Sequence, residues 1–170
     1  MSRKYLISRD DASNLAGEDL FWAVVEPMWE DLNFYEDPRT AADFFEMASP
    51  VQGAMIAMWW CRSEVCNGGF DQFFWNSTGM IWPCALQGFR LVGANSYAEL
   101  LEKALSVFPG GVAPIERNER DKILESNEER MNTLEPTDQA FFALEREKTE
   151  NLNALCAKYI RSNPNEFFKD

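Results

Sequence analysis

The stretch that most constrains how this chain folds spans residues 51–79. Residues 51–60 are an apolar run, and they follow Ser49-Pro50, a pair suited to the N-cap and first turn of a helix. Asn67-Gly68-Gly69 then supplies residues that tolerate a positive φ, as a helix C-terminus requires. Four large aromatic residues follow, too many to leave in water together. This order predicts a buried helix, a corner set by glycine, and an aromatic segment packed behind it.

The same stretch resembles the signature of a known family. The sequence SEVCNGGFDQFFWNSTG is similar to that of small bacterial proteins long catalogued as a domain of unknown function, whose best-known members are DNA mimics. Cys66 stands where the family's pattern has asparagine. Two further segments, LLEKALSVFPGG and LNALCAKYIRSNPNEF, extend the resemblance to about residues 50–168. The positions that match the pattern are Glu64, Val65, Asn67, Gly68, Gly69, Phe70, Gln72, Phe73 and Asn76.

Composition limits the kinds of partner. The 170 residues are 46% hydrophobic and 26% charged, which is typical of a globular protein with its own core. The formal net charge of −12 argues against direct binding of DNA or RNA and suits a basic protein surface. No apolar run reaches the ~18 residues of a membrane span, and no signal peptide is apparent. We therefore expect a cytoplasmic protein with no membrane contact.

The cysteines do not indicate a metal site. Cys61, Cys66, Cys84 and Cys156 form no CxxC pair, and the chain has no histidine. A zinc site would need all four thiols, or carboxylates from scattered positions. Reduced thiols in apolar surroundings are the better interpretation, and we expect neither metal nor cofactor.

The sharpest compositional feature is the acidic segment, residues 10–46. It contains eleven acidic residues against one base, Arg39, and so carries −10 of the net charge. Positions 21, 25, 28, 29 and 32 share one apolar face of a helix. Asp19, Glu26 and Glu30 share another face, and Pro27 is expected to interrupt the helix. A second short helix is expected over residues 40–48, burying Phe44 or Phe45.

Two interpretations of this segment stay open. Carboxylates at i and i+4 lie about 6 Å apart along a helix, whereas duplex DNA carries one charge per ~1.7 Å of axis. Mimicry of DNA would therefore need two acidic elements side by side, or a dimer. The alternative is a solvated face over an apolar core. If the segment binds a partner, its contact residues are Asp19, Glu26, Glu30, Asp31, Glu36, Asp37, Asp43 and Glu46.

The remaining pattern is helical. We expect a helix over residues 82–92, with its inward side formed by Leu86, Phe89, Leu91 and Val92. A second helix is expected over residues 96–107, beginning with a Ser96–Glu99 capping box. An exposed, salt-bridged helix is expected over residues 116–130, and a last one over residues 136–160. No strand pattern or repeat is evident. The prediction is an all-α chain, a single compact domain of about seven to nine helices with antiparallel neighbours. Residues 1–49 would form an acidic helical extension packed on a family domain at 50–170. Two helices side by side could form a homodimer seam, and a seam within the core is equally possible.

Three functions follow from these observations. The resemblance implies a non-enzymatic acidic protein that binds the basic DNA-binding surface of a transcription regulator and competes with DNA. An acidic face could also block a toxin or nuclease, as an immunity-type inhibitor does, and the motif could mark only a structural domain. An enzyme would use Glu64 and Asp71 as acid and base with Asn67 and Gln72 nearby, and it predicts a polar pocket at the glycine corner. Glu64 paired with Arg62 or a backbone amide, and a solvated Asp71, would give these carboxylates no catalytic role.

Overall fold

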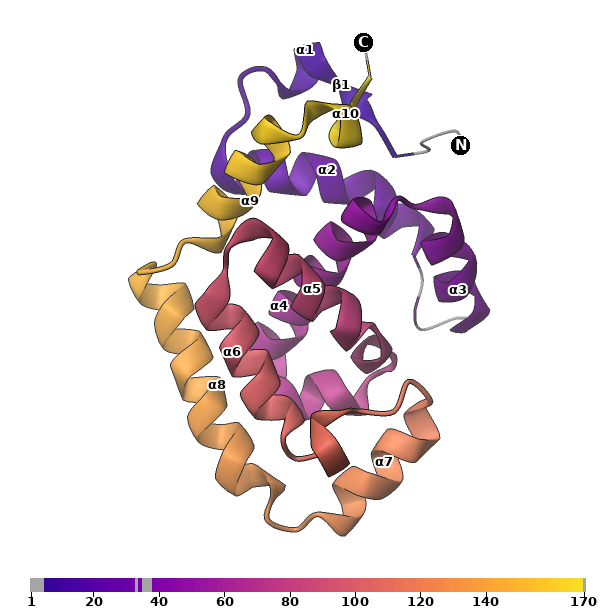
Figure 1. Cartoon of the computed structure of the whole chain (residues 1–170), viewed down its shortest axis with the longest axis vertical. Helices are drawn as coiled ribbons and strands as arrows, with labels where there is room; N and C mark the ends of the chain where they lie inside the picture. Colours follow the sequence, from indigo (N-terminus) through magenta and orange to yellow (C-terminus); the bar gives the residue numbers. More distant parts are fainter. Residues whose placement is uncertain (1–4, 33, 35–37, 170) are drawn as a thin grey trace. The chain divides into compact units, whose positions relative to one another are not determined.

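The computed structural model describes residues 5–32, 34 and 38–169 (Figure 1). Within these ranges the chain forms ten α-helices, two short 3-10 helices and two two-residue strands, so the predicted all-α class is confirmed. Two of the helices, α1 and α10, have only four residues and are too short to leave a periodic apolar pattern. No helix in these ranges is both long and apolar enough to cross a lipid bilayer.

The first of two compact units comprises residues 1–56 and 151–170. Helices α2 and α9 pack against each other and lie side by side in Figure 1. Their facing sides are buried, with Phe21 and Val25 on α2 and Cys156 and Ile160 on α9. The elements of this unit are β1 (Ile7–Ser8), α1 (Arg9–Ala12), α2 (Gly17–Asp31), α3 (Pro38–Met47), the start of α4 (Pro50–Trp75), α9 (Leu152–Ser162), α10 (Pro164–Phe167) and β2 (Phe168–Lys169).

Hydrogen bonds connect the N-terminal and C-terminal segments of the chain within this unit. Strands β1 and β2 pair in parallel, with Ile7 opposite Phe168. The fully buried Gln52 donates from Nε2 to the carbonyl of Tyr5 at 3.1 Å and to that of Glu166 at 3.3 Å. The same glutamine completes a capping box at the start of α4, because its Oε1 accepts from the backbone N–H of Ser49 while its own N–H donates to the Ser49 hydroxyl.

Helix α2 runs through Pro27 without a break, so the predicted interruption is wrong. Proline inside a helix costs about 3 kcal/mol through its missing N–H and its steric clash. Val24, Val25 and Met28 flank Pro27 and are fully buried, and each such side chain contributes roughly 1.5–3 kcal/mol. The apolar face shared by both halves of the helix therefore outweighs the penalty.

The second unit comprises residues 57–150. Its core contains a continuous series of ring contacts with centroids 5.0–6.2 Å apart, in the order Phe108, Phe74, Phe70, Phe141, Tyr97, Phe89. The predicted aromatic packing is therefore confirmed. The elements are the rest of α4, η1 (Ser77–Ile81), α5 (Trp82–Val92), α6 (Asn95–Leu105), η2 (Pro109–Gly111), α7 (Arg117–Ser126) and α8 (Arg130–Glu147).

Several helix ends differ from prediction. The expected helix over residues 136–160 is two helices, because Lys148 adopts a left-handed conformation (φ 52°) after α8 and Asn151 caps α9 by accepting from the Ala154 N–H. The Ser96–Glu99 capping box does not form. The Glu150 carboxylate accepts from both the backbone N–H and the hydroxyl of Ser96 and so caps α6 from outside the helix.

Two further expectations about side chains are wrong. Leu91 of α5 is 37% exposed and does not point inward. Arg120 of α7, expected on an exposed salt-bridged helix, is the largest fully buried side chain in the described part of the chain. The division of the chain at residues 49 and 50, by contrast, rests on composition and resemblance and stays a prediction.

Candidate functional site

The predicted contact residues lie on α2 and α3 of the first unit. Glu36 and Asp37 fall outside the described residues. The other six side chains are all exposed, and we call them the acidic face: Asp19, Glu26, Glu30, Asp31, Asp43 and Glu46.

The α2 part of the acidic face follows from helical periodicity. Asp19, Glu26 and Glu30 lie at nearly the same azimuth, because steps of seven and four residues return close to the same side of a helix. Their axial separations are about 10 Å and 6 Å at 1.5 Å per residue. The opposite side of α2 is buried, so the three carboxylates are held in one direction by the packing of the helix. A row of charges on a fixed helix can meet a row of cations.

Aromatic rings border this row. Trp22 and Trp29 are partly exposed, and their ring centroids lie 5.9 Å apart in an edge-to-face arrangement. Glu26 lies between them in sequence, one turn from each. An arginine that pairs with Glu26 could therefore also contact an indole ring, which a guanidinium does better than an ammonium.

The end of α2 and the second half of α3 carry the remaining residues of the acidic face. The Tyr5 hydroxyl donates to Asp31 Oδ2 at 3.0 Å, which fixes this carboxylate while leaving it exposed. On α3, Phe44 is buried as predicted, and its ring contacts that of Tyr5 at 5.3 Å. Asp43 and Glu46 are exposed on the same helix.

The glycine corner lies in the second unit, within α4. Gly68 (φ −154°, ψ 20°) and Gly69 (φ 78°, ψ −179°) break the helical conformation and redirect the chain, as the sequence predicts. A Cβ on Gly69 would lie 2.3 Å from Asp138 Oδ2, so the corner has no room for a side chain. Asn67 and Gly68 are exposed, whereas Phe70 and Phe73 are fully buried.

Glu64 joins the motif residues on either side of the corner. Its side chain is 5% exposed and accepts three hydrogen bonds, from Gln72 Nε2 at 2.8 Å, Asn76 Nδ2 at 2.9 Å and Thr78 Oγ1 at 3.0 Å. Three polar residues of the SEVCNGGFDQFFWNST stretch therefore converge on the buried carboxylate of a fourth, Glu64. Such an arrangement stabilises the corner and uses both carboxylate oxygens.

Helix α8 holds the corner from the other side. Asp138 Oδ1 accepts from the Phe70 N–H at 2.8 Å, and Arg130 Nε donates to Asp71 Oδ1 at 2.8 Å. Burial raises the pKa of Asp138 above its ordinary range, partly offset by the Phe70 N–H. Asp71 is therefore an ion-pair partner of α8. Asp138 was missed from the sequence because nothing local distinguishes it from the other acidic residues of α8.

Further along α8, Glu145 is paired with α4 and α6. Arg62 donates to both carboxylate oxygens of Glu145 at 2.8–3.0 Å, and the buried Tyr97 hydroxyl donates to Oε1 at 3.0 Å. Burial and the neighbouring carboxylate raise the pKa of Tyr97. These contacts give Glu145 and Arg62 a structural role.

Arg120 is the second residue that sequence reasoning missed. Its guanidinium donates to four carbonyls, those of Phe74 (2.9 Å), Asn76 (2.9 Å), Pro114 (3.0 Å) and Ile115 (2.6 Å). Burial lowers its pKa. The hydrogen bonds of Arg120 connect the end of α4 to the loop before α7. No local sequence signal distinguishes Arg120 from its exposed neighbours.

Two of the four cysteines lie in the core. Cys61 and Cys156 are buried, and burial raises the pKa of the Cys61 thiol. Among the described residues, no three His, Cys, Asp or Glu side chains are placed to share a metal ion.

A comparison with family models matched residues 46–163 to the DMP19-like protein family. The chain belongs to this family. The predicted resemblance to the family that includes DNA-mimic proteins is thus confirmed. No curated protein and no solved structure gave a match.

The DMP19-like match and the acidic face overlap little. All the motif residues fall within it, but Glu46 is the only residue of the acidic face that does. The matched region has a net charge of −5, and residues 1–45 have −6. The acidic face therefore has to be tested as a property of this chain.

Proposed function

We propose that this chain is a non-enzymatic acidic protein that binds the basic DNA-binding surface of a transcription regulator and competes with DNA for it. Membership of the DMP19-like family supports the class of function. The observation that carries the proposal here is that all six described residues of the acidic face are exposed, on two helices whose opposite sides are buried.

The mechanism is electrostatic. Lysine and arginine side chains that otherwise contact phosphates meet the carboxylates of α2 and α3, and long-range attraction speeds the encounter. Binding should weaken as salt rises, because exposed charge pairs are screened within about 8–10 Å at 0.10–0.15 M salt. Arginines placed beside Trp22 and Trp29 gain ring contacts in addition to ion pairs.

The charge density of a single acidic helix is lower than that of duplex DNA. The row Asp19, Glu26, Glu30 places three charges over about 16 Å of axis, whereas duplex DNA of that length carries roughly ten. The charges of α3 are therefore needed as well. The six described carboxylates of α2 and α3 can still occupy the few cations at the centre of a DNA-binding surface.

The test is affinity capture from host lysate with matched variants. The first replaces Glu26, Glu30, Asp43 and Glu46 with lysine, all exposed and away from helix N-termini. The control replaces four exposed acids of the second unit with lysine, Glu125, Glu128, Glu135 and Glu147. Both raise the net charge from −12 to −4, so only the position of the charge differs.

The proposal predicts that wild type and control retain a basic DNA-binding protein, that duplex DNA elutes it, and that the α2/α3 variant loses it. Equal retention by both variants would place the contact elsewhere. Retention of a nuclease or toxin would favour the immunity-type inhibitor instead.

A further inference from the structure

The acidic face is divided between two helices of the first unit. Four of its carboxylates belong to α2, and the other two, Asp43 and Glu46, belong to α3. Like charges repel one another, so electrostatics alone does not keep the two helices in one arrangement. A partner with cations at fixed positions meets both helices best when buried groups hold them in place. Tyr5 is such a group, because its side chain contacts α2 and α3 at once.

The Tyr5 side chain is only 3% exposed, and its two ends have different contacts. Its hydroxyl donates to Asp31 Oδ2 on α2 at 3.0 Å. Its ring centroid lies 5.3 Å from that of Phe44 on α3, the residue that follows Asp43. One buried side chain therefore orders a carboxylate of α2 and packs against α3 one residue from another carboxylate.

The backbone of Tyr5 is also held in place. Its carbonyl accepts from Nε2 of the fully buried Gln52 at 3.1 Å, and the same nitrogen donates to the carbonyl of Glu166. Two residues further on, Ile7 pairs with Phe168 in the parallel contact of β1 and β2. Helix α4 and the C-terminal segment thus set the position from which Tyr5 contacts the acidic face.

We propose that Tyr5 is a positioning residue for partner binding, which orders Asp31 before the partner arrives and holds α3 in place relative to α2. This inference rests on the function proposed above. A carboxylate that is already ordered loses less rotamer freedom when it pairs with a cation. An ionised carboxylate offers about four acceptor positions, so the bond from Tyr5 does not prevent Asp31 from also accepting from a lysine or arginine. Tyr5 lies before the matched residues 46–163, as most of the acidic face does.

The first measurement is a double-mutant cycle on the affinity for the regulator recovered by capture. Tyr5→Phe removes the hydroxyl and keeps the ring, so Asp31 loses its donor while the contact with Phe44 remains. We expect Tyr5→Phe to bind the regulator about two- to tenfold more weakly, because the carboxylate then has to be ordered on binding. In the Asp31→Ala background the same change should have no further effect, since the hydroxyl acts through that carboxylate.

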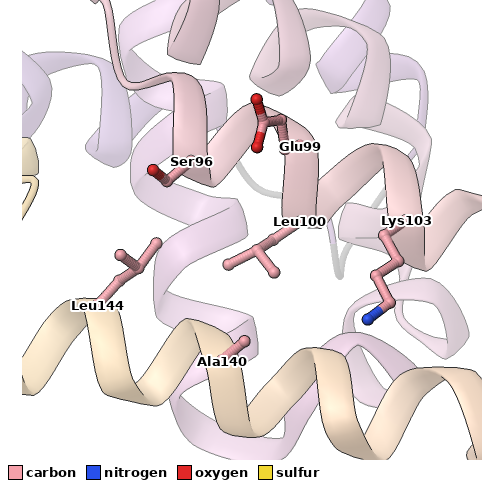
Figure 2. A pocket seen from close by; sticks show the side chains of 6 residues that line it. All are labelled: Ser96, Glu99, Leu100, Lys103, Ala140 and Leu144. Carbon is pink, nitrogen blue, oxygen red and sulfur yellow. The ribbon is translucent and has the colours of Figure 1, made fainter.

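Tyr97→Phe is the matched control, because it also removes the hydroxyl of a buried tyrosine that donates to a carboxylate at 3.0 Å. Tyr97 lies on α6 and its acceptor Glu145 on α8, the two helices that border a shallow groove of about 310 Å³ in the second unit (Figure 2). Neither residue lines the groove, so the change leaves that surface as it is. Tyr97→Phe should leave the affinity for the regulator unchanged.

The second measurement needs no partner. Amide hydrogen exchange of α3 reports how often that helix opens locally. Tyr5→Leu removes both the ring contact with Phe44 and the hydroxyl, and it should speed exchange of the α3 amides by about threefold or more, because an aromatic pair is lost. Tyr5→Phe keeps the pair and should leave this exchange near the wild-type rate.

Three results would each overturn the proposal: wild-type affinity in Tyr5→Phe, an undiminished effect of that change in the Asp31→Ala background, or wild-type exchange of α3 in Tyr5→Leu. An equal loss of affinity in Tyr97→Phe would also overturn it. Failure of the proposed function looks different, because the capture would then yield no regulator, or the α2/α3 variant would retain it as well as wild type does. The exchange measurement would still decide whether Tyr5 holds α3.

Discussion

Replacing Gly69 with alanine should lower the free energy of unfolding by about 3–5 kcal/mol. Two effects contribute. The conformation at φ 78°, ψ −179° is one that side chains rarely adopt, at a cost of roughly 1–3 kcal/mol. The new Cβ would also lie 2.3 Å from Asp138 Oδ2. Asp138 then has to move and lose its bond from the Phe70 N–H, a charged hydrogen bond that contributes about 1.5–3 kcal/mol.

Gly93 provides the matched control. It ends α5 with φ 80°, ψ 20°, and no heavy atom outside its own neighbourhood lies within 4 Å of the Cβ position. Gly93→Ala should cost only the left-handed conformation, about 1–2 kcal/mol. The difference between the two variants isolates the contact with Asp138.

The assay is urea unfolding at 25 °C, followed by tryptophan fluorescence and by circular dichroism. Gly69→Ala combined with Asp138→Ala should cost about 1.5–3 kcal/mol less than the sum of the single changes, because the clash then disappears. If Gly69→Ala destabilises the protein no more than Gly93→Ala, the account of the corner as held by Asp138 is refuted.

Three further predictions concern buried polar groups and use the same unfolding assay. Glu64→Ala should lower the free energy of unfolding by about 3 kcal/mol or more, because the fully buried Thr78 hydroxyl and two further donors lose their acceptor. Glu64→Gln should lower it less, because the amide keeps one acceptor oxygen. Equal losses of stability in the two variants would contradict this role of Glu64. The raised pKa of Asp138 means that the folded state binds its proton more tightly than the unfolded state, so its contribution to stability is complete below its ordinary value of 3.8 and is lost as pH rises through the raised value. Asp138→Asn keeps the acceptor for Phe70 and should make stability decline less as the pH rises above 3.8, measured as unfolding midpoints from acid to neutral pH. An unchanged pH profile would count against the titration. Arg120→Met should cost more than about 3 kcal/mol, because four carbonyls lose their donor, and a loss below 1 kcal/mol would show that water replaces the guanidinium.

Much of the fold could be predicted because the sequence signals that specify it lie within a few neighbouring residues. The Ser49-Pro50 start of α4, the Gly93 end of α5 and the apolar side of α2 each depend on a few neighbouring residues. The glycine corner was predictable for the same reason, since Gly69 provides a positive φ that other residues rarely adopt.

The errors arose where distant residues decide the outcome. Pro27 stays within α2 because tertiary burial outweighs its local cost. Helix α6 is capped by Glu150, 54 residues beyond Ser96, so the local capping-box pattern was misleading. The break at Lys148 has one local signal, the N-cap residue Asn151, but the apolar stripe that continues across the break predicts a single helix.

In the candidate site, too, features that depend on neighbouring residues could be predicted, and features that depend on distant residues could not. The exposure of Asp19, Glu26 and Glu30 follows from helical periodicity and was predictable. The donors around Glu64 lie within the motif, but their convergence depends on how the chain turns at the corner. Asp138 and Arg120 reach the motif from α8 and α7, and a single sequence carries no sign of those contacts.

The most direct test of the central claim is a competition measurement. A fluorescently labelled duplex is bound to the regulator obtained by capture, and anisotropy is followed as the chain is added. We expect the wild type and the second-unit control variant to displace the DNA, and the variant with lysine at Glu26, Glu30, Asp43 and Glu46 to leave it bound. A complex that contains chain, regulator and DNA together, or equal displacement by the α2/α3 variant, would contradict the claim that the acidic face takes the place of DNA.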